Sequence, residues 1–343
     1  MSVTSQKFDY LIFIGRFQPP HAGHISVIDK ALELSSKIII ILGSAKIAPT
    51  IRDPFNTSAR EQMIRSCYSE DRNERLLFRS VEDFRYNDDK WISQVRSAVF
   101  DLTRKEANAK IGLIGHSKDH SSYYLKLFPD WGHIDVPNYK GLNSTEIRND
   151  FFIKQKIDRS IMPISVIECL ERFQQDQRFS TIRDEFLFVE KYKQQWNNSP
   201  YPVIFQTVDA VVVQSGHILL IERDAQPGRG LMALPGGFLN YDESLEEGVL
   251  RELYEETRIS VPKPVLKGSI SKIETFDDVH RSSRGRTITR AFLINLKNET
   301  SLPKIKGSDD ARKAMWVPIN WVLENRDQLF EDHYDIITAM IGV

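Results

Sequence analysis

The chain has 343 residues, of which 41% are hydrophobic and 27% charged, a composition typical of soluble globular proteins with room for two domains. Its 46 Lys and Arg nearly balance its 47 Asp and Glu, and this net charge of −1 gives no indication of nucleic-acid binding. Two isolated cysteines, no signal-peptide pattern and no apolar run near ~20 residues lead us to expect a cytosolic protein without disulfides, a cysteine zinc site or a membrane segment.

The first elements form a strand, loop, helix and strand. Residues 8–14 (FDYLIFI) predict a buried strand, and residues 37–42 (KIIIIL) predict a second one. Between them, His21 and His24 stand in an H-x-G-H pattern where a helix is expected to begin. A helix N-terminus carries free N–H groups and about half a positive charge, which favours phosphate. The two imidazoles can donate further hydrogen bonds, so a phosphate site is expected here.

In this setting H-x-G-H, with residues 15–19 (GRFQP) upstream, resembles the nucleotidyltransferase superfamily, which joins a nucleoside triphosphate to a phosphate or alcohol and releases pyrophosphate. Residues 143–148 (NSTEIR), at another expected helix start, resemble the S-T-x-x-R element of that superfamily. The resemblance implies a triphosphate site with Mg²⁺ bound by the phosphates. The residues it implies there are Gly15, Arg16, His21, His24, Ser144, Thr145 and Arg148.

Three further segments resemble the archaeal-type nicotinamide mononucleotide (NMN) adenylyltransferases, over about the first half of the chain. They are residues 53–57 (DPFNT) before a helix bearing Arg60 and Glu61, then Asp83, Asn87 and Trp91 after a strand at 76–81, and residues 112–120 (GLIGHSKDH). The resemblance implies that Trp91 stacks on the nicotinamide ring with Asn87 beside it. An aromatic platform suits a flat cationic ring, because stacking and cation–π attraction add. The alternative is that Trp91 is an ordinary core aromatic.

The chain is expected to divide within residues 196–202 (WNNSPYP), which combine turn formers and two prolines. Before this linker, strands alternate with helices and predict a mostly parallel sheet, with residues 162–173 and 183–196 as closing helices. After it, the pattern is α+β. The expected elements there are a hairpin of 208–213 and 217–222, strands at 270–276 and 287–296, and a terminal helix near 332–341. We therefore expect an α/β fold, with a Rossmann-like domain at 1–196 and an α+β domain at 203–343.

The sharpest signature of the chain runs from Gly237 to Glu256 and reads G-x5-E-x7-R-E-U-x-E-E, where U is apolar. Ser244 and Glu247 form a capping box that starts a helix. Three glutamates then stand at i, i+3 and i+4 and share one face of the helix. Three close carboxylates resist ionising together unless a cation sits among them, and oxygen ligands suit Mg²⁺ or Mn²⁺. The alternative is a charged amphipathic helix whose glutamates are merely solvated.

This segment resembles the Nudix box of hydrolases that act on nucleoside diphosphates linked to another group. The resemblance implies that Gly236 and Gly237 shape the loop before the helix and that Arg251 orients the glutamates by ion pairing. Arg258 stands where the family usually has glycine, so the resemblance does not decide the conformation of the turn after the helix. The implied metal ligands are Glu252, Glu255 and Glu256, with Glu243 in support.

Residues 276–287 (FDDVHRSSRGRT) resemble the basic loop of Nudix domains that handle ADP-ribose. Its arginines, Arg281, Arg284 and Arg286, suit phosphates or ribose hydroxyls, and the alternative is a solvated charged hairpin. The SQPWPFP-type signature of NADH-cleaving relatives is absent from the sequence, so ADP-ribose is the expected substrate.

Together the halves resemble the bifunctional NMN adenylyltransferase/ADP-ribose pyrophosphatases, with ATP, NMN, NAD and ADP-ribose as small-molecule partners. Two alternatives remain: another phosphate acceptor such as phosphopantetheine in the first half, and a non-catalytic ADP-ribose sensor in the second. The resemblance implies these catalytic residues: His21, His24, Arg148, Arg251, Glu252, Glu255 and Glu256. Oligomeric state, the Nudix general base and the relative placement of the two sites stay open.

Overall fold

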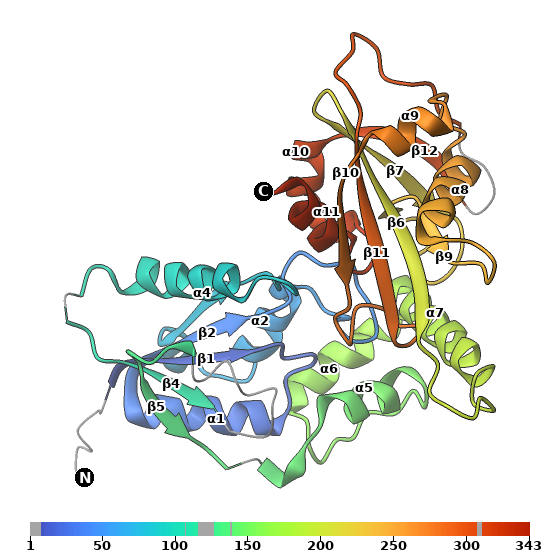
Figure 1. Ribbon diagram of the computed structural model, residues 1–343. Helices are drawn as coiled ribbons and strands as arrows, with labels where there is room; N and C mark the ends of the chain where they lie inside the picture. The colour runs from blue at the N-terminus through green and yellow to red at the C-terminus, as the bar shows by residue number, and fades with distance from the viewer. Residues whose placement is uncertain (1–7, 107, 116–126, 138, 307–310) are drawn as a thin grey trace, which may run out of the picture. The chain divides into compact units, whose positions relative to one another are not determined.

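The computed structural model describes residues 8–106, 108–115, 127–137, 139–306 and 311–343. Residues 116–120, which belong to a segment quoted above, lie outside this range. The chain forms two compact units, Met1–Arg183 and Asp184–Val343 (Figure 1). This division falls at residue 184, inside a helix, whereas the sequence pattern predicts it at 196–202.

The first unit contains a parallel sheet of strand order β3-β2-β1-β4-β5. Its strands are β1 (Phe8–Gly15), β2 (Ser35–Leu42), β3 (Leu76–Ser80), β4 (Ile111–Gly115) and β5 (Gly132–Asp135). Alternate side chains of β1 enter two different cores: Leu11 and Phe13 one, Tyr10 and Ile12 the other. A strand buried on both faces needs a continuous apolar run, and residues 8–14 have one.

Helices cover both faces of this sheet. Helix α1 (Ala22–Leu34) buries Val27 and Ile28 in one core, and α4 (Asp88–Thr103) buries Val95 and Val99 in the other (Figure 1). The other helices of the first unit are α2 (Thr57–Arg65), α3 (Glu70–Asn73), α5 (Ser144–Phe152), α6 (Ile164–Phe173) and the first turns of α7 (Gln177–Gln194). The predicted Rossmann-like layering is confirmed.

Helix α7 begins six residues earlier than its predicted start at 183. The Asp176 carboxylate accepts a hydrogen bond from the Arg178 N–H at 2.9 Å and starts the helix there. Phe179 and Ile182 then enter the core formed by α2, α5 and α6.

The second unit is a mixed sheet of order β10-β11-β6-β7-β12, with β8 paired to β7 and β9 to β6. Its strands are β6 (Phe205–Gln214), β7 (His217–Arg223), β8 (Met232–Ala233), β9 (Gly236–Phe238), β10 (Ile270–Phe276), β11 (Thr287–Asn295) and β12 (Ala311–Pro318). The predicted hairpin turns at Ser215 and Gly216, with φ of 47° and 73°. Two successive positive φ values match the right-handed twist of the flanking strands.

Helices lie on both faces of the second sheet as well. Helix α8 (Leu245–Thr257) packs Val249 and Leu253 against Val208 and Ala210 of β6. On the other face, the start of α11 (His333–Ile341) meets Asp209 of β6 (Figure 1). The short helices α9 (Lys263–Gly268) and α10 (Ile319–Glu324) complete the α+β pattern that the sequence predicts.

Within the described residues, no helix is both long enough and apolar enough to cross a membrane. A cytosolic location stays a prediction.

Candidate functional sites

The first candidate site lies at the start of α1, where two histidine rings cap the helix. His21 Nδ1 accepts a hydrogen bond from the Gly23 N–H, and His24 Nδ1 accepts one from the His21 N–H, both at 3.2 Å. In a neutral ring, an accepting Nδ1 leaves the proton on Nε2. His21 Nε2 lies 3.1 Å from the Ser144 hydroxyl of α5, so it is a donor there. The two rings are thus held by the backbone at the start of the helix, and the other nitrogen of His21 meets the Ser144 hydroxyl.

The S-T-x-x-R element reaches the same place from α5. Asn143 caps this helix by accepting from the Thr145 N–H at 2.9 Å. The Arg148 side chain is buried and donates to the Gln18 carbonyl at 3.0 Å and to the Thr145 hydroxyl at 3.2 Å. Burial and then the charge of Arg16 lower the pKa of Arg148 to about 10. The structure therefore brings the two motifs together around partly desolvated cations, an arrangement that favours a polyphosphate.

The sequence left three neighbours of this site without a role. Arg60 is fully buried and donates to the carbonyls of Arg16 at 2.6 Å and Gly43 at 2.7 Å. Asp53 lies 3.9 Å from both Arg16 and Arg52, and burial followed by the Arg16 charge lowers the pKa of Arg52. In the described part of the chain, Arg16 Nη1 and Asp53 Oδ1 are buried without a hydrogen bond. The quoted D-P-F-N-T segment was the available signal, since Asp53 is its first residue and Arg52 directly precedes it.

Asn87 and Trp91, the implied nicotinamide contacts, stand on the first turn of α4. Asn87 caps α4, and its side-chain oxygen accepts from the Lys90 N–H at 2.9 Å. Trp91 is half-buried at the margin of one core, with its ring centroid 6.0 Å from that of Phe128. It thus takes part in core packing, and its stacking on a nicotinamide ring stays a prediction.

The second candidate site is built on α8. Both hydrogen bonds of the predicted Ser244–Glu247 capping box are present, which confirms it. Arg251 is the centre of the acidic cluster. Its guanidinium lies 2.6 Å from a Glu243 oxygen and 2.9 Å from oxygens of Glu252 and Glu255. The hydrogen bond from Arg251 is the main reason that the pKa of Glu243 falls to about 2.

The deepest glutamate of this cluster is Glu256, which is only 8% exposed and accepts from the Gly236 N–H at 2.9 Å. Burial, with a smaller contribution from the charge of Glu252, raises the pKa of Glu256 to about 8. Burial also raises the pKa of Glu252. A Cβ on Gly237 would come within 2.6 Å of a Glu252 oxygen, so the loop needs glycine to admit that carboxylate. These glutamates are not a solvated face.

The donor set suits a divalent cation, because buried carboxylates with raised pKa values gain most from a metal charge. Among the described residues, however, no three His, Cys, Asp or Glu side chains already stand as a metal-binding group. Arg251 supplies the positive charge among them instead.

The turn after α8 and the arginines of residues 276–287 are the remaining predicted features of the second site. Arg258 adopts the left-handed conformation that a glycine would take, with φ of 43°. Arg281 is 4% exposed and pairs with buried Asp332 through two bonds of 2.9 and 3.0 Å. Arg284 lies over the Phe238 ring at 5.1 Å, and Arg286 donates to the Asp277 carbonyl. The three arginines thus have three different environments.

Comparison with known proteins adds to this geometry. Residues 204–340 match the NUDIX domain family model, and residues 12–150 match the cytidylyltransferase-like model. The chain is 39% identical over 180 residues to a nicotinamide/nicotinic acid mononucleotide adenylyltransferase of Acinetobacter baylyi, covering 52% of this chain and 94% of that protein. It is 34% identical over 130 residues to an ADP-ribose pyrophosphatase of Methanocaldococcus jannaschii, covering 38% of this chain and 69% of that protein.

Some solved structures match almost the whole chain, and we describe one of them. It is a bifunctional NMN adenylyltransferase/ADP ribose pyrophosphatase from Francisella tularensis, complexed with AMP and a Mn ion. The TM-score is 0.92 at 36% identity, covering 98% of this chain and 99% of that one. The resemblance and the fold class predicted from the motifs are both confirmed. The chain belongs to the family of bifunctional NMN adenylyltransferases/ADP-ribose pyrophosphatases.

Proposed function

We propose that this protein is a bifunctional enzyme of NAD metabolism. The first unit transfers AMP from ATP to NMN, giving NAD and pyrophosphate. The second hydrolyses ADP-ribose to AMP and ribose 5-phosphate with a divalent metal. The observation that supports this proposal is that each unit brings residues of its motif into contact: His21 with Ser144 in one, and Arg251 with the glutamates around it in the other.

In the first unit, the NMN phosphate attacks the α-phosphorus of ATP, and pyrophosphate leaves with the electron pair of the broken bond. Both groups react without an enzyme nucleophile, so positioning and charge neutralisation supply the catalysis. Arg16, His21, His24 and Arg148 would neutralise the triphosphate, with Gly15, Ser144 and Thr145 lining it. Asn87 and Trp91 would hold the nicotinamide end.

In the second unit, Glu252, Glu255 and Glu256, supported by Glu243, would hold Mg²⁺ or Mn²⁺. The bound metal supplies an acidified water and a polarised diphosphate. Arg251 keeps the carboxylates in place, and Gly237 leaves room for Glu252. Arg281, Arg284 and Arg286 would contact the phosphates or ribose of the substrate. Arg281 would do so while it is paired with Asp332.

The first experiment incubates the pure protein with Mg²⁺ in two tubes, one with NMN and ATP and one with ADP-ribose, and resolves the products by chromatography. We expect NAD in the first tube and AMP in the second. NAD without AMP would make the second unit a sensor or a hydrolase of another diphosphate. AMP without NAD would move the first unit to another acceptor, such as phosphopantetheine.

Two substitutions separate the activities. Glu255→Gln removes one metal-binding charge and should abolish hydrolysis while sparing adenylyl transfer, and His24→Ala should do the reverse. Losing a hydrogen-bond donor to the transition state, the role proposed for His24, typically costs about 10²–10³ in kcat.

Matched controls come from the same units. Glu246→Gln changes a glutamate of α8 that pairs with Lys267 instead, and His133→Ala changes an exposed histidine of β5. Both controls should keep both activities. If Glu255→Gln or His24→Ala removed both activities from a folded protein, the two-site model would be wrong.

A further inference from the structure

The segment that leads into α11 runs beside β8 and is bonded to it like a short parallel strand. Met232 forms a bridge with Leu329, and the Phe330 N–H donates to the Met232 carbonyl at 2.9 Å. A parallel ladder would next pair the Leu234 N–H with the Phe330 carbonyl. That carbonyl instead accepts from the His333 N–H at 3.0 Å, because the chain turns into the helix. The ladder therefore loses its next backbone acceptor.

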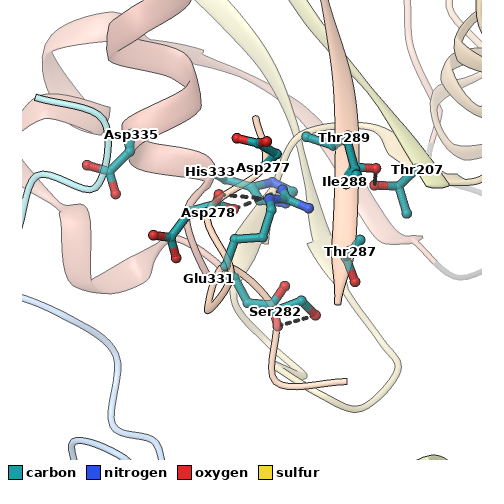
Figure 2. Close-up of polar contacts among 12 residues, drawn as sticks. Thr207, Asp277, Asp278, Ser282, Thr287, Ile288, Thr289, Glu331, His333 and Asp335 are labelled. Atoms are coloured by element: carbon teal, nitrogen blue, oxygen red, sulfur yellow. Dashed lines mark hydrogen bonds and ion pairs between the residues drawn. The ribbon is translucent and has the colours of Figure 1, made fainter. Parts of the chain in front are cut away.

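The His333 side chain replaces that acceptor. Its Nδ1 accepts the Leu234 N–H at 2.8 Å, in a buried position. Its Nε2 faces Asp209 at 4.0 Å, and the other Asp209 oxygen accepts from the Thr289 hydroxyl. Figure 2 draws His333 at the start of α11 with Thr289 on β11. Because Nδ1 accepts from the Leu234 N–H, the neutral ring carries its proton on Nε2, the nitrogen that faces Asp209.

Burial keeps this ring in its neutral form. His333 is 7% exposed, and desolvation lowers its pKa to about 3, so Nδ1 stays an acceptor across the physiological range. A buried N–H without a partner carries a desolvation penalty, so Leu234 depends on this one bond.

The turn that begins at Leu234 leads directly to the proposed metal ligands. The Pro235 carbonyl accepts from the Ala210 N–H at 2.8 Å, and the Gly236 N–H donates to Glu256 at 2.9 Å. A Cβ on Gly236 would lie 2.2 Å from the Val208 carbonyl. The turn is thus clamped between β6, α8 and α11, and a shift at Leu234 would displace the N–H that holds Glu256.

We propose that His333 is a positioning residue of the hydrolase site. It holds the turn of residues 234–237 through the Leu234 N–H, and the turn in turn sets Glu256 and Glu252 for the metal. The role rests on the proposed hydrolase function, but its effect on metal binding can be measured without substrate.

Two amide substitutions separate the two nitrogens of the ring. In His333→Asn, the side-chain oxygen takes the place of Nδ1 and keeps the bond from Leu234. In His333→Gln, the longer amide reaches the place of Nε2 beside Asp209 and leaves the Leu234 N–H without an acceptor. Both residues are neutral, polar and smaller than or close to histidine in volume, so they form a matched pair.

The measurements are Mn²⁺ affinity by electron paramagnetic resonance without substrate, then kcat and KM for ADP-ribose. We expect His333→Gln to weaken Mn²⁺ binding and lower kcat by about 10–100-fold, as loss of groups that orient metal ligands typically does. His333→Asn should stay close to the unmodified protein. NAD synthesis from NMN and ATP should be unchanged in both, which shows that the first unit is intact. Urea unfolding of each variant reports whether the second unit, which contains residue 333, is folded.

Equal Mn²⁺ affinities in the two variants would overturn the proposal, whether both are high or both are low. A Mn²⁺ difference in a protein that does not hydrolyse ADP-ribose would support the positioning role and contradict the proposed hydrolase. Hydrogen exchange of the Leu234 amide tests the unmodified protein itself. Slow exchange supports the bond to His333, and exchange as fast as in an exposed loop overturns it.

Discussion

At the scale of single residues, His21 and His24 serve the fold and the site together. The Nδ1 atom of each ring accepts a hydrogen bond from a backbone N–H at the start of α1. That bond fixes the proton on Nε2, which in His21 meets Ser144. The sequence predicts two imidazoles at a helix mouth, but not that they cap it, because the usual capping residues are Ser, Thr, Asp and Asn.

The pKa of His333 leads to a prediction about acid stability. Its pKa is about 3 in the folded protein and 6.5 as the ordinary value, so the unfolded chain binds a proton that the folded one does not. This contribution to stability is complete above pH 6.5 and is lost as the pH falls toward 3, by at most about 1.4 kcal/mol per pH unit. His333→Asn should therefore lose less stability than the unmodified protein between pH 7 and 5.

Urea unfolding at pH 7, 6 and 5 measures this difference. The charged groups around the ring, Asp209, Asp332, Arg281, Arg223 and Arg284, are the same in both proteins, so the difference between them reports His333. Parallel stability curves for the two proteins would show that the ring does not titrate on unfolding in this range.

At the scale of elements, the two ends of α8 differ in how well the sequence suits them. The start has both hydrogen bonds of its capping box. The end places Arg258 at φ of 43°, a conformation that costs a residue with a side chain roughly 1–2 kcal/mol. Helix α8 therefore has a strained C-terminus just after its last glutamate.

Replacing Arg258 with glycine should relieve this strain. We expect Arg258→Gly to raise the free energy of unfolding of the second unit by about 1 kcal/mol. Arg258→Ala is the control, because it also removes the guanidinium that lies 5.1 Å from the Tyr254 ring but keeps the strained backbone. Urea unfolding of both variants decides the point. If alanine stabilises as much as glycine, backbone strain is not the cause.

At the scale of the whole molecule, α7 crosses the division between the units. Its second half belongs with the hydrolase by contact. Glu185 of α7 accepts from the Gly228 N–H at 2.9 Å, and two residues after the helix the Trp196 ring lies 5.3 Å from the Phe205 ring. The assignment of the two activities to residues 1–196 and 203–343 stays a proposal. The contacts group the second half of α7 with the second unit, and so with residues 203–343.

Two fragments of the hydrolase test this placement. A fragment of residues 184–343 keeps the Glu185 and Trp196 contacts, and a fragment of residues 203–343 lacks them. We expect the shorter fragment to melt lower by on the order of 5 °C, because it exposes Phe205 and leaves the Gly228 N–H unpaired. Thermal unfolding with ADP-ribose hydrolysis as the activity check measures this. Equal melting temperatures would place the whole of α7 with the first unit.

The sequence by itself determined both chemistries and the fold class. The Nudix glutamates, the H-x-G-H element and the apolar strands are patterns of neighbouring residues, and helix and strand periodicity places such neighbours without knowledge of the rest of the chain. The expected α8 capping box and the β6–β7 turn formed for this reason.

Only the tertiary structure decided which polar groups meet. Arg281, expected at a substrate phosphate, pairs with Asp332, 51 residues away, and His333 bonds to Leu234, 99 residues away. Arg60 holds the Arg16 carbonyl across 44 residues. Partners so distant are set by strand order and by the burial of unpaired polar groups, which no local spacing encodes.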